Sequence, residues 1–571
     1  MPVGGPTGEL VLRGAIKGQR RRVVSASVLG MTHQSCEALV PVVIGAAIDA
    51  AVATGSSGAL LRWLLVLGVL FLVLSTCYRT SARIAEGAGE HAAHLLRLEL
   101  GARVLDPRGG ADANRLPGAL TSIATNDARR VGSVATVLPY GCAAIAALVV
   151  SAVALLRISV PLGLLVLLGI PPLLWLGHRI SLPLERRSEA EQESAAHASG
   201  VAADLISGLR VLKGMGAESA AVARYRTTSQ DSLAAALRAA RSRAGHEGAL
   251  LGLTGVFIAL IGIVGAYLAM DGSISVGDLV AAVGLAQFLL GPFQLLSYAN
   301  AEFAQARASA RRIAEVLASP AAVSGGTRAP AGTEAGHVRF RDVRLGALRG
   351  VDLDLPAGSL TGIVTRDPAA AHDLLLALAR EADPTAGHVE LDGVPLTELD
   401  PDLLRRAVLV AHHDADLFES SLLEVVRADT GDAEAGRADA GKVDAALAAS
   451  TADEVTRLLP NGADTVLAER GRSLSGGQRQ RVALARALAA DRPVLVLHDP
   501  TTAVDTVTES RIAAQLREMR QGRTTVLITT SPALLARTDR VIVLDEGTVT
   551  ADGSHAELLA ADESYRKAVL A

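Results

Sequence analysis

The first half of the chain contains apolar stretches long enough to cross a lipid bilayer. A membrane-spanning helix needs about 20 mostly apolar residues, and one such stretch, Gly248–Met270, carries no charge at all. Six stretches meet the requirement: Val23–Ala50, Leu60–Tyr78, Val134–Leu156, Val160–Leu176, Gly248–Met270 and Val276–Tyr298. We therefore expect an all-α transmembrane domain of six helices.

Two long polar stretches between these helices, Arg79–Arg130 and Arg179–Gly245, are rich in Ala, Leu, Arg and Glu. They predict extensions of the membrane helices, interrupted by the breaker-rich segments Asp106–Leu120 and Ser207–Tyr225. Basic clusters flank the spans, so the positive-inside rule places the extensions and both termini in the cytoplasm. Glu37 lies inside the first span, where it either lines a transport path or bonds to a neighbouring helix.

A different pattern begins after a Gly-, Ala- and Pro-rich linker, Ala318–Gly336. Short apolar stretches alternate with helical ones, which is typical of an α/β domain with a parallel sheet. Strands are expected in residues 337–343, 350–356, 358–365, 493–499, 524–530 and 540–547. The predicted organisation is an N-terminal tail (1–20), a transmembrane domain (21–317), a linker (318–336) and an α/β domain (337–571).

Composition excludes several classes of function. A formal net charge of -4 gives no indication of nucleic-acid binding. The three cysteines have neither metal-ligand spacing nor the pattern of a disulfide framework. No apolar stretch precedes the basic cluster near the N-terminus, so we expect no cleavable signal peptide.

A glycine-rich segment, Leu474-Ser475-Gly476-Gly477-Gln478, directly precedes a helical stretch. Its glycines allow close approach of another group to the backbone. Ser475 offers a hydroxyl, and the N-terminus of the following helix attracts anions. The segment therefore predicts a contact with phosphate, although a plain turn at a helix start is the alternative.

This segment and its surroundings resemble ABC transporters of the exporter type. The resemblance rests on LSGGQRQRVALARAL (474–488), DPTAGHVELDG (383–393), TTAVD (501–505) and DRVIVLDEGTVTADGSHAELL (539–559). It covers nearly the whole chain. It implies an integral protein of the plasma (inner) membrane, with six helices followed by a cytoplasmic nucleotide-binding domain that uses ATP and Mg²⁺. The two interruptions between membrane helices resemble coupling helices.

The stretch that should form the family's phosphate loop departs from the pattern. In TRDPAAAHD (365–373), Thr365, Pro368 and Ala370 stand where the family has glycines. Ala371 stands at the lysine, and His372 at the Ser or Thr that ligates magnesium. Hydrogen bonds to charged groups contribute about 1.5–3 kcal/mol each, so losing several predicts a large loss of nucleotide affinity.

Other nucleotide-contacting positions also depart from the family. The magnesium-binding Asp aligns with His498, the catalytic Glu with Asp499, the Q-loop Gln with His413, and the switch His with Thr530. A register that makes Asp499 the magnesium ligand leaves the spacing to Asp505 one residue short. The resemblance thus implies a degenerate site with no intact catalytic residue and no ATPase activity in this chain alone.

In the family, nucleotide lies between the phosphate loop of one subunit and the signature of the other. The resemblance therefore implies that residues 474–478 and Asp505 contact ATP held by a partner: a second ABC half-transporter with an intact phosphate loop. The cargo would be a small molecule, a lipid or a peptide. Two alternatives remain open: an exporter-fold importer, for example of metal–siderophore complexes, and a non-transporting regulatory subunit.

Three of the magnesium-linked positions have become histidine: His372, His413 and His498. Imidazole is a good ligand for zinc, nickel or iron(II). We therefore expect a possible transition-metal site in the vacated pocket, with Asp499 as a fourth ligand. The alternative is that the histidines only fill space.

Overall fold

The computed structural model describes residues 6–52, 55–113, 115–332, 336–413, 416–427 and 440–570. Residues 1–5 of the predicted tail and 333–335 of the predicted linker lie outside this range. The chain divides into two compact units, Met1–Leu100 with Pro117–Ala318 and Gly101–Leu116 with Ser319–Ala571.

One segment, Gly101–Leu116, belongs to the second unit although the predicted boundaries place it in the membrane domain. Hydrogen bonds from this segment to residues of the second unit explain why it belongs there. The Arg108 carbonyl accepts hydrogen bonds from the backbone N–H groups of Ala322 and Val323. Arg405 donates to the Pro107 carbonyl at 2.6 Å.

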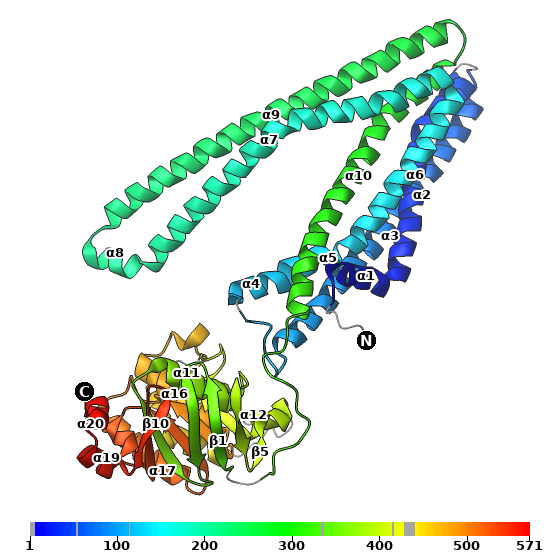
Figure 1. Ribbon diagram of the computed structural model, residues 1–571. Coiled ribbons are helices and arrows are strands. Elements are labelled where there is room, and N and C mark those ends of the chain that lie inside the picture. The colour runs from blue at the N-terminus through cyan, green and yellow to red at the C-terminus, as the bar shows by residue number, and fades with distance from the viewer. Residues whose placement is uncertain are drawn as a thin grey trace. The chain divides into compact units, whose positions relative to one another are not determined.

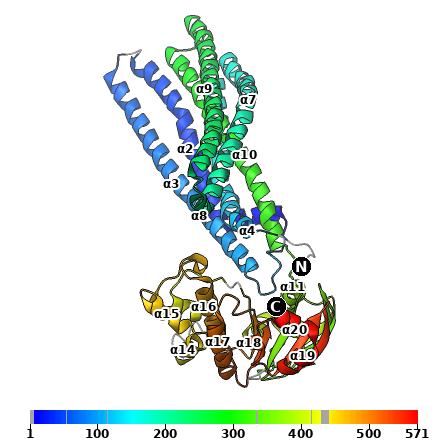
Figure 2. The same cartoon turned by 90° about the vertical axis from the view of Figure 1, so that its left-hand side faces the viewer.

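The described residues of the first unit form helices and connecting turns (Figure 1). In chain order these are α1 (Gly8–Gly18), α2 (Arg20–Ala47), η1 (Ile48–Val52), α3 (Ser57–Val104), α4 (Pro117–Ser122), η2 (Ile123–Asp127), α5 (Ala128–Gly132), α6 (Val134–Ile158), α7 (Val160–Ser207), α8 (Leu209–Met215), α9 (Glu218–Met270) and α10 (Val276–Leu317). Helix α2 packs against α6 and α10. Helices α7 and α9 run side by side as a long hairpin with α8 at its tip (Figures 1 and 2).

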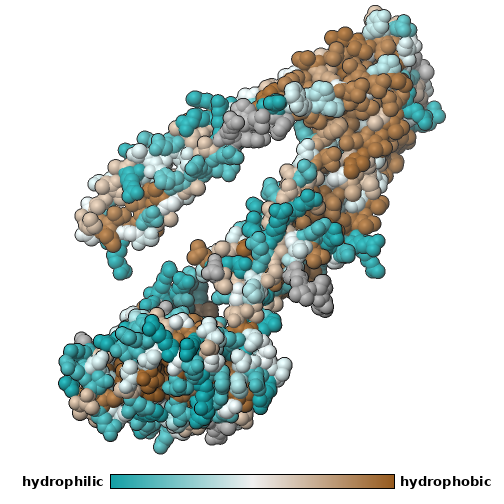
Figure 3. All heavy atoms as spheres, viewed as in Figure 1, coloured by the Kyte–Doolittle hydropathy of each residue, from teal (hydrophilic) through white to brown (hydrophobic). Residues whose placement is uncertain are grey.

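Five described helical segments are long and apolar enough to cross a membrane: Ser57–Val104, Pro117–Ile158, Val160–Gly177, Glu218–Met270 and Val276–Leu317. The predicted first span forms helix α2, which is not among them. It carries His33, Gln34 and Glu37 between its apolar residues. Apolar side chains gather on the upper part of this unit in Figure 3, and polar ones predominate along the hairpin toward α8.

The stretch predicted to be an N-terminal tail contains helix α1. Thr7 caps this helix, since its hydroxyl oxygen accepts a hydrogen bond from the Leu10 N–H. Val11 and Leu12 are buried, and the helix packs against α10. The segment is therefore part of the folded unit.

The second unit contains two sheets. Its strands are β1 (Val338–Leu345), β2 (Leu348–Leu355), β3 (Leu360–Thr365), β4 (Ala386–Leu391), β5 (Val394–Pro395), β6 (Val408–Ala411), β7 (Val494–His498), β8 (Thr524–Ile528), β9 (Arg540–Asp545) and β10 (Thr548–Gly553). The larger sheet has the order β10-β9-β3-β8-β7-β6, and all its neighbours pair in parallel except β10 with β9. The smaller sheet, β2-β1-β4-β5, is antiparallel.

The helices of this unit are α11 (Pro368–Ala379), η3 (Leu396–Glu398), α12 (Pro401–Ala407), α13 (Leu422–Arg427), α14 (Ala440–Ala449), α15 (Ala452–Leu458), η4 (Gly462–Asp464), η5 (Glu469–Gly471), α16 (Gly476–Ala489), α17 (Thr506–Met519), α18 (Pro532–Leu535), α19 (His555–Ala561) and α20 (Glu563–Leu570). Helices α11, α12, α16, α19 and α20 contact strands of the larger sheet. The α/β fold class is confirmed, and all six predicted strands form. Strands β7 and β8 are buried along nearly their whole length, as expected for a parallel sheet covered on both faces. One hydrophobic core includes α11, and another includes α13 to α17.

Candidate functional site

Four of the segments singled out by sequence lie at or just after the carboxyl ends of strands β3, β6, β7 and β8, which run parallel. The carboxyl ends of parallel strands meet at one edge of a sheet, where open α/β sheets bind ligands. The topology therefore brings four of the predicted segments to the same edge.

The turn after β3 is short and ends in an acidic helix cap. Only Arg366 and Asp367 separate β3 from α11. The Asp367 carboxylate accepts a hydrogen bond from the Ala369 N–H at 2.9 Å. Pro368 occupies the first turn and has no N–H to donate. A carboxylate thus occupies the helix N-terminus, the place where a phosphate would otherwise bind.

The side chains of Ala371, His372 and Asp373 point in different directions. Ala371 is buried in the core, with 5% of its surface exposed. His372 is exposed. The Asp373 carboxylate accepts a hydrogen bond from the Ala347 N–H at 2.7 Å and so holds the turn between β1 and β2. The positions aligned with the family's lysine and magnesium ligand therefore do not converge.

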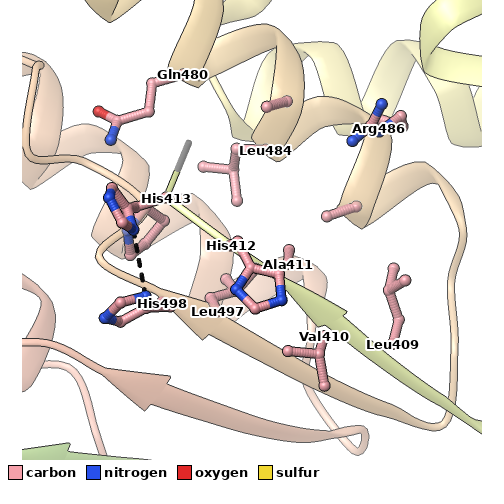
Figure 4. Close-up of a pocket in the computed structure, with 13 residues that line it drawn as sticks. Leu409, Val410, Ala411, His412, His413, Gln480, Leu484, Arg486, Leu497 and His498 are labelled. Atoms are coloured by element: carbon pink, nitrogen blue, oxygen red, sulfur yellow. Dashed lines mark hydrogen bonds between the residues drawn. The ribbon is translucent and has the colours of Figure 1, made fainter. Parts of the chain in front are cut away.

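At the ends of β6 and β7, two imidazole rings face each other (Figure 4). The Nδ1 atoms of His413 and His498 are 3.3 Å apart, and the ring planes meet at 88°. The Asp499 carboxylate lies 3.8 Å from Nε2 of His498, on the other side of that ring. Asp499 has a φ of 44°, in the left-handed region that Asp tolerates.

The predicted three-histidine metal site is not formed. Among the residues that the structure describes, no group of three or more His, Cys, Asp or Glu side chains could hold a metal ion. His413 and His498 meet, but His372 does not join them. The reason is the start of α11 at Pro368, which turns Ala370, Ala371, Leu374 and Leu375 into the core and leaves His372 on the outer face.

The glycine-rich segment forms the N-terminus of α16. Ser475 and Gln478 make a capping box: the Gln478 N–H donates to the Ser475 hydroxyl at 3.3 Å, and the Ser475 N–H donates to Oε1 of Gln478 at 2.9 Å. The side chain of Leu474 is buried and anchors the segment. The Ser475 hydroxyl hydrogen stays available for a ligand.

Behind this helix start lies the segment 499–505. A Cβ on Gly477 would meet the Ala503 carbonyl oxygen at 2.5 Å, so only glycine fits there. Gln480, which the sequence analysis missed, is 8% exposed. It donates to Oγ1 of Thr502 at 2.7 Å and to the Asp499 carbonyl, and it accepts from the Ala503 N–H at 2.8 Å. The signature helix and the end of β7 are thereby joined.

A cavity of about 410 Å³ opens beside Gly476 and Ala503. Arg470, Arg472 and Arg479 line it, together with one acidic residue, Asp416. The excess of positive charge suits an anionic ligand such as a polyphosphate.

The two remaining predicted positions are Asp505 and Thr530. Asp505 caps α17, and hydrogen bonds from Thr508 hold the pKa of its carboxyl below the usual value. Thr530 follows β8 and is exposed. Beside it, Glu509 accepts hydrogen bonds from Thr501 at 2.6 Å and Ser531 at 2.7 Å. No motif in the sequence had marked Glu509.

Two family profiles match the chain: the ABC transporter transmembrane region over residues 24–293 and ABC transporter over residues 348–502. An ATP-dependent lipid A-core flippase of Chromohalobacter salexigens is 30% identical over 409 residues, 70% of each protein. A multidrug efflux ATP-binding/permease protein of Mycobacterium tuberculosis is 32% identical over 97% of the chain and 47% of its own length. A solved structure of a bacterial Atm1-family ABC exporter with ATP bound has a TM-score of 0.76 and 25% identity, covering 96% of this chain and 97% of that one.

Proposed function

The chain belongs to the ABC transporter family as a membrane-bound, exporter-type half-transporter, and from this premise we propose that its own nucleotide site is degenerate. It would then be one half of a heterodimeric, ATP-driven exporter. Members of the family use ATP and Mg²⁺, and this chain would contribute its signature to a site whose phosphate loop belongs to the partner.

The observation that carries the proposal is the acidic cap of α11. An ATP phosphate at this helix end would approach the Asp367 carboxylate, which already accepts the Ala369 N–H. Two like charges about 4 Å apart repel by roughly 1 kcal/mol in bulk water and by roughly 4 kcal/mol near a protein surface, where the effective dielectric constant is lower. No lysine side chain offsets this repulsion, because Ala371 stands at that position and is buried.

The signature segment, residues 474–478, keeps the features of a phosphate-contacting helix start. The capped N-terminus of α16 presents Ser475 and two glycines beside the arginine-lined cavity. This combination supports the assignment of residues 474–478 and Asp505 as contacts to ATP on a second half-transporter with an intact phosphate loop. A chain without transport or ATPase partners would have no use for these groups, which disfavours a purely regulatory subunit.

The relatives support an amphipathic cargo. One is a flippase for lipid A-core and another a multidrug efflux protein. The efflux protein is about twice as long as this chain, since 97% of the chain matches 47% of it. The efflux protein is therefore long enough to contain a second half-transporter of similar size in the same polypeptide. We therefore propose a small molecule, lipid or peptide as cargo, moved outward.

ATP hydrolysis by the purified full-length chain, alone and with a co-expressed half-transporter carrying an intact phosphate loop, tests the proposal. We expect no turnover alone and turnover in the pair. Ser475→Ala in this chain should then lower turnover by about tenfold or more, since it removes a hydrogen bond to a charged group. Ser510→Ala, on the exposed face of α17, is the matched control. Sustained hydrolysis by the lone chain would refute the proposal.

A further inference from the structure

The two facing imidazoles at the ends of β6 and β7 have a geometry that the proposed function does not use. We propose that His413 and His498 form a two-histidine binding site for a divalent transition metal ion of the zinc class. The inference rests on the local geometry of the pair and not on whether the chain works as a heterodimer.

The separation of the two nitrogens fits one edge of a tetrahedral site. Their Nδ1 atoms are 3.3 Å apart and share a hydrogen bond, which a bound ion would replace. With zinc–nitrogen bonds of about 2.0–2.1 Å, this separation corresponds to an N–Zn–N angle of about 104–111°. The tetrahedral angle of about 109° lies within this interval. The separation of the two nitrogens therefore matches that of two zinc ligands once the ion replaces the shared hydrogen.

The position of Asp499 favours the tautomer that metal binding needs. Both Nδ1 atoms must present lone pairs, so the ring hydrogens must sit on Nε2. The Asp499 carboxylate lies 3.8 Å from Nε2 of His498. A carboxylate beside the outer nitrogen favours a hydrogen there and orients the ring toward the metal. With a metal bound, Asp499 would act as an outer partner of His498 rather than as the fourth ligand predicted from sequence.

The surroundings leave room for an ion and its water. A cavity of about 160 Å³ adjoins the pair, lined by Leu409, Val410, Leu484 and Leu497 among others (Figure 4). Gln480 supplies no ligand, because its amide already bonds to the segment 499–503. Arg486 also lines the cavity and disfavours a cation, although its guanidinium donates to the Asp416 carbonyl at 3.0 Å.

The proposed site has only two protein ligands, His413 and His498. Water must complete the coordination, so binding should be weaker and faster to exchange than at structural sites with four protein ligands. The bound ion would tie the loop after β6 to the end of β7, two neighbouring parallel strands.

Titration of the nucleotide-free, full-length chain with Zn²⁺ alone, followed by calorimetry, tests the inference. We expect about one ion per chain. His413→Ala and His498→Ala should each weaken binding about tenfold or more, because loss of a ligand costs at least as much as loss of an outer partner. Binding should also weaken in acid, because protons compete with the metal for imidazole nitrogens.

Two other histidines provide matched controls. His412→Ala removes the neighbouring ring that lines the same cavity, and His372→Ala removes the exposed ring on α11. Both variants should bind Zn²⁺ as the unaltered chain does. The visible absorption of bound Co²⁺ gives a second measurement, and a tetrahedral spectrum should disappear in the His413 and His498 variants. Substoichiometric Zn²⁺ binding, or binding that survives in both ligand variants, would overturn the inference.

Discussion

The contact between Gly477 and Ala503 gives the sharpest test of how the signature is held. Alanine at Gly477 would place its Cβ 2.5 Å from the Ala503 carbonyl oxygen. An ordinary contact begins near 3.4 Å, so the helix start or the segment 499–505 must move by roughly 0.5–0.9 Å. Overpacking of this kind costs about 1–3 kcal/mol, partly offset by the roughly 0.4–1 kcal/mol that alanine gains over glycine in the unfolded chain.

The neighbouring glycine is a matched control. A Cβ on Gly476 would meet only the Ala503 side chain, at 3.6 Å, which is an ordinary contact. Gly477→Ala should therefore lower the free energy of unfolding by about 0.5–2 kcal/mol, while Gly476→Ala should leave it unchanged or raise it slightly.

Thermal unfolding of the full-length chain in detergent provides the assay. One kcal/mol corresponds to about 2–4 °C for a unit of 150–250 residues, so Gly477→Ala should unfold a few degrees below Gly476→Ala. In the complex with the partner, a misplacement approaching 1 Å can lower ATP turnover by up to about a hundredfold. If Gly477→Ala unfolds at or above the temperature of Gly476→Ala, the packing argument is wrong.

Three further predictions concern the second unit. Asp367→Ala should lower the free energy of unfolding by about 1 kcal/mol because α11 loses its cap, whereas Asp367→Asn should be nearly neutral in chemical denaturation because Asn caps equally well. Gln480→Ala should cost about 1–3 kcal/mol in the same measurement, since the N–H of Ala503 loses its acceptor; an unchanged midpoint would show that water replaces the amide. Burial lowers the pKa of His555 below 6.5, so the unfolded chain binds more protons and stability should fall as the pH drops below about 6.5. His555→Asn should remove that part of the pH dependence, and an identical pH profile in both proteins would contradict the assignment.

Much of the fold could be predicted from the sequence because its signals are local. Five of the six predicted apolar stretches lie in helical segments long and apolar enough to cross a membrane, and the buried strands marked the parallel sheet. Helix α1 was missed because it is short and its apolar residues, such as Val11 and Leu12, are buried only by packing against distant helices such as α10. The separate antiparallel sheet was missed because strand patterns do not reveal which strands pair.

The candidate site was predictable only in part. The Asp367-Pro368 pair is a typical helix start, and Ser475 with Gln478 is a typical capping box, so both helix ends were visible in the sequence. The grouping of His372 with His413 and His498 failed because it assumed the family's geometry for the loop. Once α11 begins at Pro368, the helical period alone turns His372 outward.

The length of the α7–α9 hairpin has a mechanical consequence. Helix α9 has 53 residues, which makes it about 80 Å long at 1.5 Å per residue. The hydrocarbon core of a bilayer takes up about 30 Å of that, so an arm of about 50 Å extends beyond the lipid. Tilting such an arm by about 10° at the membrane moves its end by about 9 Å, more than the 5.4 Å pitch of the helix itself. A small tilt at the membrane would therefore become a large displacement of α8 at the tip of the hairpin.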